Sequence, residues 1–133
     1  MLTVLGACLL VAGCAPEPEP PATFQPSTPA EAAALTYFTS AVKPVLRQNC
    51  YRCHSGMNHK SGFNLSTREL LLKGGSNGVD VVPGHPESSL LVKLIRHQNP
   101  TEHPGPMPQK GKLSDTEIGT IEKWIADGAI MDR

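Results

Sequence analysis

Cys50-Tyr51-Arg52-Cys53-His54 is the stretch of this 133-residue chain that decides the fold. It places two thiols three residues apart and an imidazole directly after the second thiol. On a helix, residues three and four apart share a face, so both sulfur atoms and the imidazole point to one side. The motif therefore predicts a single site to which Cys50, Cys53 and His54 all contribute.

The Cys-x-x-Cys-His spacing is typical of covalent haem c attachment, in which the sulfurs bond to the haem vinyl groups and His54 binds the iron. The alternatives are a zinc site, a thioredoxin-like redox pair and a structural disulfide. Zinc needs a further ligand, but the other histidines form no second pair at helical spacing, and no βαβ pattern supports a redox pair. Those histidines are His59, His85, His97 and His103. We therefore expect one haem c on Cys50 and Cys53. Such a group also supplies apolar bulk to a chain that is only 5% aromatic.

The N-terminal residues have the pattern of a targeting segment. Residues 2–11 form an apolar run of signal-peptide length that is too short to span a bilayer. The run ends in Val11-Ala12-Gly13-Cys14, which resembles the lipobox of bacterial lipoproteins. This resemblance implies that residues 1–13 are a signal peptide and that Cys14 carries the lipid. The chain is then anchored in the cell envelope facing the periplasm, in the outer membrane where one exists, as Ala15 implies.

The remaining chain divides into a tether and one domain. Residues 14–35 are rich in proline and cannot bury a core, so we expect an extended tether there. Residues 36–133 form the predicted domain, which is of common size for a single domain. The formal net charge is zero, which excludes a nucleic-acid footprint over the whole protein.

Four segments of the chain carry helix signals. Capping boxes precede apolar residues at Thr28–Glu31, Ser66–Glu69 and Ser114–Glu117, and Pro86 opens a further helix. Pro44 must kink the first helix, end it, or lie in the first turn of a new one. The residues expected on buried helix faces are Phe38, Val42, Val45, Leu46, Leu90, Leu91, Leu94, Ile95, Ile118, Ile121, Trp124 and Ile125. No segment alternates with period two, so the expected fold is all-α, with about four short helices and long loops.

The domain resembles the planctomycete-type cytochrome c domain, a small branch of the class I cytochrome c fold. The shared segments, in order, are Phe38–Leu46, Cys50–His54, Leu65–Glu69, Lys73–Gly75, Val82–Gly84, Ser89–Leu91, Met107–Pro108 and Gly111–Ser114. The resemblance implies a haem held between an N-terminal and a C-terminal helix, with methionine as the second axial ligand.

Met107 is the predicted distal ligand, and His103 is the alternative. Met107 follows residues 99–106, where three prolines favour a loop over the ring face without helix or strand. Met57 follows His54 too closely to reach the other face, and Met131 lies beyond the last helix, so both are expected to be packing or surface residues.

Three further residues have open roles. Arg68 either contacts a haem propionate or is solvated at the start of its helix. Gly74 and Gly75 either allow backbone to approach the porphyrin edge or only end a helix.

These patterns predict a membrane-anchored carrier of single electrons between redox proteins of the envelope, and not an enzyme. The first alternative is a haem-based sensor or enzyme with an open distal site, and the second is a zinc-stabilised interaction module. Redox partners, reduction potential and oligomeric state do not follow from the sequence.

Overall fold

The computed structural model describes residues 23–99 and 103–133. The predicted signal peptide and residues 14–22 of the predicted tether, Cys14 included, therefore lie outside the described residues. The rest of the predicted tether is described, and from Pro29 onward it is helical and not extended. Within them the elements are α1 (Pro29–Tyr37), a π-helical turn (Phe38–Val42), α2 (Lys43–Asn49), α3 (Tyr51–His54), β1 (Asn58–His59), a 3₁₀ turn (Lys60–Gly62), α4 (Arg68–Lys73), a 3₁₀ turn (Pro86–Ser88), α5 (Leu90–Ile95) and α6 (Asp115–Ala126). The described chain is mostly helical, with long loops, as expected from the sequence.

Pro44 neither ends nor breaks the first helical stretch. Thr28 caps α1 through the predicted box with Glu31, and the chain then stays helical to Asn49. The turn before Pro44 is π-helical, and the Lys43 amide donates to the carbonyl of Phe38. Because proline has no N–H and its ring crowds the carbonyl four residues earlier, a wider turn accommodates it within the helix.

The start of α4 differs from the sequence prediction by one residue. The N-cap is Thr67, whose side chain accepts from the Leu70 amide, and not Ser66. The Ser66 hydroxyl accepts instead from the Gly56 amide over 2.6 Å. The Ser66 side chain, which local sequence favours as a cap, thus bonds to a residue outside the helix instead.

The start and the buried face of α5 also differ from the prediction. Pro86 opens only a 3₁₀ turn, and α5 begins after Ser89. The buried Ser89 hydroxyl accepts from the Val82 amide and donates to the His85 carbonyl, so it braces the preceding loop instead of capping the helix. The buried face of α5 includes Val92, and Leu90 is only half-buried.

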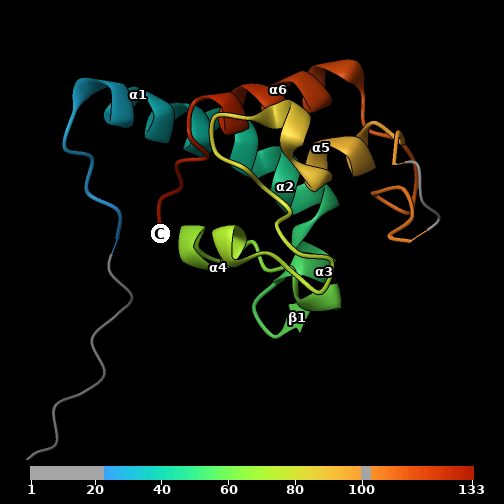
Figure 1. The fold of residues 1–133 in the computed structure, drawn as a ribbon. Coiled ribbons are helices and arrows are strands. Elements are labelled where there is room, and N and C mark those ends of the chain that lie inside the picture. Colours follow the sequence, from blue (N-terminus) through green and yellow to red (C-terminus); the bar gives the residue numbers. More distant parts are fainter. Residues whose placement is uncertain (1–22, 100–102) are drawn as a thin grey trace, which may run out of the picture.

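α6 crosses the first helical stretch in Figure 1, and buried apolar side chains of both form the core. Ser114 and Glu117 form the predicted capping box of α6, and the four predicted apolar residues of this helix are buried. Trp124 packs against Phe38 with ring centroids 5.8 Å apart, and its Nε1 donates to the Ile130 carbonyl over 2.8 Å. Packing of these two rings therefore links the first helical stretch to α6, near the other end of the domain.

The C-terminal residues close the fold by binding to three segments. The Arg68 amide donates to the Arg133 carbonyl, and the C-terminus lies beside α4 in Figure 1. Lys43 pairs with Asp132, whose carbonyl accepts from the Phe24 amide. None of the helices in the described residues is long and apolar enough to cross a membrane.

Candidate functional site

One cavity of about 450 Å³ brings together the predicted thioether cysteines, the proximal histidine and the distal methionine. Cys53 and His54 lie on α3, and Cys50 immediately precedes it. Met107 reaches the cavity from the loop between α5 and α6, more than fifty residues later in the chain. The fold therefore places Cys50, Cys53, His54 and Met107 around one space.

The other residues of the cavity wall suit a flat apolar ring that carries two carboxylates at one edge. Its apolar part is Phe63, Leu65, Leu91, Leu94 and Ile95. Arg52, Lys60 and Lys110 are exposed and also line it, so cations lie at its edge. An apolar interior suits a porphyrin ring, and cations at the edge suit propionates. The residues present therefore fit a haem.

The imidazole of His54 is held by a backbone acceptor. Its Nδ1 lies 3.3 Å from the carbonyl oxygen of Phe63, and the two rings meet edge-on with centroids 5.4 Å apart. A proton on Nδ1 donates to this carbonyl, which leaves Nε2 as the lone-pair nitrogen for a metal. This contact both orients the ring and selects its tautomer.

The two thiols are half-buried, and they are not joined in a disulfide. Burial raises the pKa of Cys50 to about 11, although Lys110 partly opposes the shift. With its pKa raised in this way, the Cys50 thiol is protonated at neutral pH, and a protonated thiol is a poor nucleophile for disulfide exchange.

The loop that carries Met107 is fixed at two points. The Met107 amide donates to the carbonyl of Leu94 on α5 over 3.1 Å. The Lys110 ammonium donates to the carbonyl of Gln48 on α2 over 3.2 Å. These contacts hold the Met107 segment beside the cavity. His103, the alternative distal ligand, is exposed and is not among the cavity-lining residues.

Arg68 has a different partner from either one expected. Its Nε donates to the Ala129 carbonyl over 3.1 Å, and a terminal nitrogen donates to the Gly128 carbonyl over 3.0 Å. Because these bonds tie α4 to the C-terminal segment and Arg68 does not line the cavity, we assign it no propionate contact. The basic residues at the cavity edge are better placed for that role.

The glycine pair after α4 allows a close backbone contact. Gly74 ends the helix with φ of 72°, in the left-handed region that favours glycine. A Cβ atom on Gly75 would lie 2.5 Å from the Ser61 carbonyl oxygen, closer than such atoms can approach. Gly75 thus accommodates the 61–63 backbone, a role that differs from the two expected from the sequence.

Besides the three basic residues at the edge, sequence reasoning missed a buried carboxyl group of the cavity wall. Asp80 is 5% exposed, and its Oδ2 accepts from the Gly75 amide over 2.7 Å. Burial raises the pKa of this carboxyl, with the Gly75 amide and His54 opposing the shift. The available signal was a lone carboxylate inside the apolar run Val79-Asp80-Val81-Val82.

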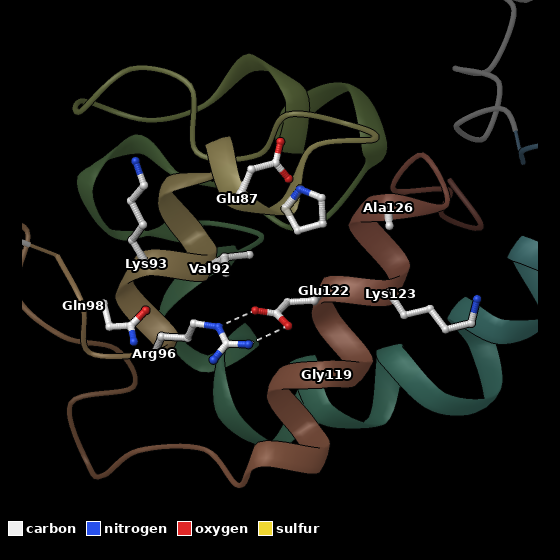
Figure 2. A pocket seen from close by; sticks show the side chains of 10 residues that line it. Glu87, Val92, Lys93, Arg96, Gln98, Gly119, Glu122, Lys123 and Ala126 are labelled. Atoms are coloured by element: carbon white, nitrogen blue, oxygen red, sulfur yellow. Dashed lines mark hydrogen bonds and ion pairs between the residues drawn. The ribbon is translucent and has the colours of Figure 1, made fainter.

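A second and larger hollow, of about 840 Å³, lies between α5 and α6 and is shown in Figure 2. Arg96 and Glu122 face each other across it in a forked ion pair, with one N–O distance of 2.8 Å. Its lining has charges of both signs and includes none of the predicted ligands. The smaller cavity, with the motif, is therefore the candidate site despite its size.

The chemistry of the donors also bears on the zinc alternative. Among residues 23–99 and 103–133, no three His, Cys, Asp or Glu side chains are grouped so that they could hold a metal ion. A structural zinc ion needs four such donors.

A family model described as Planctomycete cytochrome C matches residues 50–111. Residues 50–111 are therefore similar to planctomycete cytochromes c. The match includes the Cys-x-x-Cys-His motif and Met107, so it spans both sides of the cavity. This similarity to a cytochrome c family indicates haem c as the cofactor. Neither a curated protein nor a solved structure matches the chain.

Proposed function

We propose that the protein is a c-type cytochrome with one covalent haem, which carries single electrons in the cell envelope. The observation that carries this proposal is the single cavity that Cys50, Cys53, His54 and Met107 all line. The motif alone provides three of these groups, and the fold adds the fourth from a distant loop.

Each of these residues has a distinct part in the proposal. The sulfur atoms of Cys50 and Cys53 form the two thioether bonds, which fix the ring to α3. His54 presents Nε2, because Phe63 holds Nδ1. Met107 presents a soft, uncharged thioether sulfur, which favours ferrous over ferric iron. When bound, haem supplies one-electron redox chemistry at its iron.

The carrier role rests on a closed distal side. The Leu94 and Lys110 contacts hold the Met107 loop beside the cavity, and a filled sixth position discourages binding of small ligands. The competing function is a haem-based sensor or enzyme with an open position. No specific contact in the described residues favours that alternative.

Location and partners extend the same proposal. A lipid on Cys14 anchors the protein to an envelope membrane, and the proline-rich residues between Cys14 and α1 separate the helical domain from that surface. Redox proteins of the envelope are the electron donors and acceptors. The support for this is the lipobox-like sequence and the proline-rich segment after it.

Optical spectra with carbon monoxide distinguish a carrier from a sensor. The intact protein, produced in a host that attaches haem to exported chains, is examined oxidised and reduced, with and without the gas. We expect low-spin spectra that do not change on addition of carbon monoxide. A high-spin spectrum that shifts readily with the gas contradicts the carrier function, and the absence of a Soret band contradicts the haem itself.

A further inference from the structure

Asp80 is a buried carboxylate that the proposed function does not use. It lines the cavity at 5% exposure, and it takes part in none of the ion pairs found among the described residues. A buried carboxylate without a cation is costly unless hydrogen bonds compensate it. The bond that it does make, to the Gly75 amide, is therefore the clue to its role.

Gly75 packs directly against the backbone segment 61–63. A Cβ atom at this position would lie 2.5 Å from the Ser61 oxygen and 2.9 Å from the Phe63 nitrogen. The next amide, of Ser76, donates to the Ser61 carbonyl over 2.6 Å. The turn that Asp80 holds is thus in contact with the segment ending at Phe63.

Phe63 connects the Gly75 turn to His54, because the Phe63 carbonyl accepts from His54 Nδ1. We infer that Asp80 is a positioning residue for His54, acting through the Gly75 turn and the Phe63 carbonyl. This inference rests on the proposed function, since His54 must bind the haem iron for its orientation to matter.

The expected consequence is electronic as well as structural. A strong hydrogen bond from Nδ1 makes the imidazole a better electron donor, which favours ferric iron and lowers the reduction potential. If the Gly75 turn moves, the Phe63 carbonyl moves with it and the bond weakens. The potential then rises, and the iron–histidine stretching frequency in the ferrous protein falls.

Three variants separate positioning from the charge of Asp80. Asp80→Ala removes both the acceptor and the charge, whereas Asp80→Asn removes the charge and keeps an oxygen for the Gly75 amide. Gly75→Ala keeps the charge but forces the turn away from Ser61. Asp127→Ala is the matched control, since Asp127 is an exposed carboxylate that does not line the cavity.

The iron–histidine frequency is measured in a Met107→Ala background, where the ferrous iron lacks the distal sulfur. We expect Asp80→Ala and Gly75→Ala to lower it, and Asp80→Asn and Asp127→Ala to leave it near the parent value. Hydrogen exchange of the Gly75 amide should be about tenfold faster in Asp80→Ala than in Asp80→Asn. Reduction potentials with Met107 present should rise more in Asp80→Ala than in Asp80→Asn.

Equal potentials in Asp80→Ala and Asp80→Asn, with an unchanged iron–histidine frequency, would mean that only charge matters and would overturn the inference. If Asp80→Ala fails to fold, Gly75→Ala decides, and an unchanged frequency in that variant overturns it. A wild-type chain that carries no haem contradicts the proposed function instead. In that event the exchange of the Gly75 amide and of the His54 ring proton, compared between Asp80→Ala and Asp80→Asn, still decides whether Asp80 holds the imidazole: equal exchange in the two variants overturns the inference.

Discussion

The backbone amide of Met107 donates a hydrogen bond to the carbonyl of Leu94, across 3.1 Å. The bond connects an irregular, proline-rich loop to the C-terminal part of α5, which also lines the cavity. A side chain on a loop held in this way can serve as a ligand without a helix or strand to support it.

Met107→Ala should therefore open the distal side of the haem. We expect loss of the weak far-red band of oxidised, methionine-ligated haem, and binding of carbon monoxide by the reduced protein. His103→Ala is the matched control, and it should leave both properties unchanged because His103 lies outside the cavity lining. If the low-spin spectrum depends on His103 instead, the haem is bis-histidine and the assignment of Met107 is wrong.

Removal of the buried carboxyl of Asp80 should change how stability depends on pH. Burial raises the pKa of Asp80 in the fold above its ordinary value of 3.8. The folded state therefore binds the Asp80 proton more tightly than the unfolded state does. The protonated carboxyl stabilises the fold fully below about pH 3.8, and this stabilisation is lost as pH rises through the folded pKa. Asp80→Asn, which is neutral throughout, should gain unfolding free energy relative to wild type as pH rises.

Denaturant unfolding of both proteins at several pH values between about 3 and 7 measures this difference. A difference that stays constant over the range would show that Asp80 titrates alike in the folded and unfolded states. That result would contradict the burial of the carboxyl.

Trp124→Phe should weaken the junction between α6 and the first helical stretch. The change removes the hydrogen bond from Nε1 to the Ile130 carbonyl and leaves space beside Phe38. We expect a loss of about 2 kcal/mol of unfolding free energy, with Thr116→Ala, on the exposed face of α6, within about 0.5 kcal/mol of wild type. Equal stability of the two variants would argue against this packing.

Cys14→Ser should abolish lipidation, because the predicted modification requires the Cys14 sulfur. The chain should then remain unprocessed or leave the membrane on mild washing, as fractionation and immunoblotting would show. Cys8→Ser is the control, since Cys8 lies within the predicted signal peptide and should leave processing intact. Firm membrane retention of processed Cys14→Ser protein would refute the anchor.

Local sequence signals predicted the helices better than their capping residues. The boxes at Thr28 and Ser114 form as expected, and each hydroxyl accepts from the amide of the glutamate three residues later. At Ser66, the third predicted cap, the hydroxyl instead bonds across a loop to Gly56. At Pro86 the predicted helix start is only a 3₁₀ turn, and the hydroxyl of Ser89, which precedes α5, bonds to Val82 and His85. Such tertiary contacts are absent from any local pattern.

The candidate site likewise has residues that local sequence identifies and residues that only the packing of the chain reveals. The motif itself identifies Cys50, Cys53 and His54, and the prolines before Met107 identify a loop. The sequence does not show that Arg68 bonds to the C-terminal carbonyls, or that Asp80 faces the cavity, because both depend on how distant segments pack. Family resemblance supplied the order of the motifs but not these contacts.

Intact mass spectrometry after acid–acetone extraction tests the central claim, that Cys50 and Cys53 hold a haem covalently. The mature protein, purified from a host that attaches haem to exported chains, should retain a mass equal to its polypeptide plus one haem. Cys50→Ala with Cys53→Ala should give the bare polypeptide. A wild-type mass equal to the bare chain, in a host that loads a control cytochrome normally, would contradict the account.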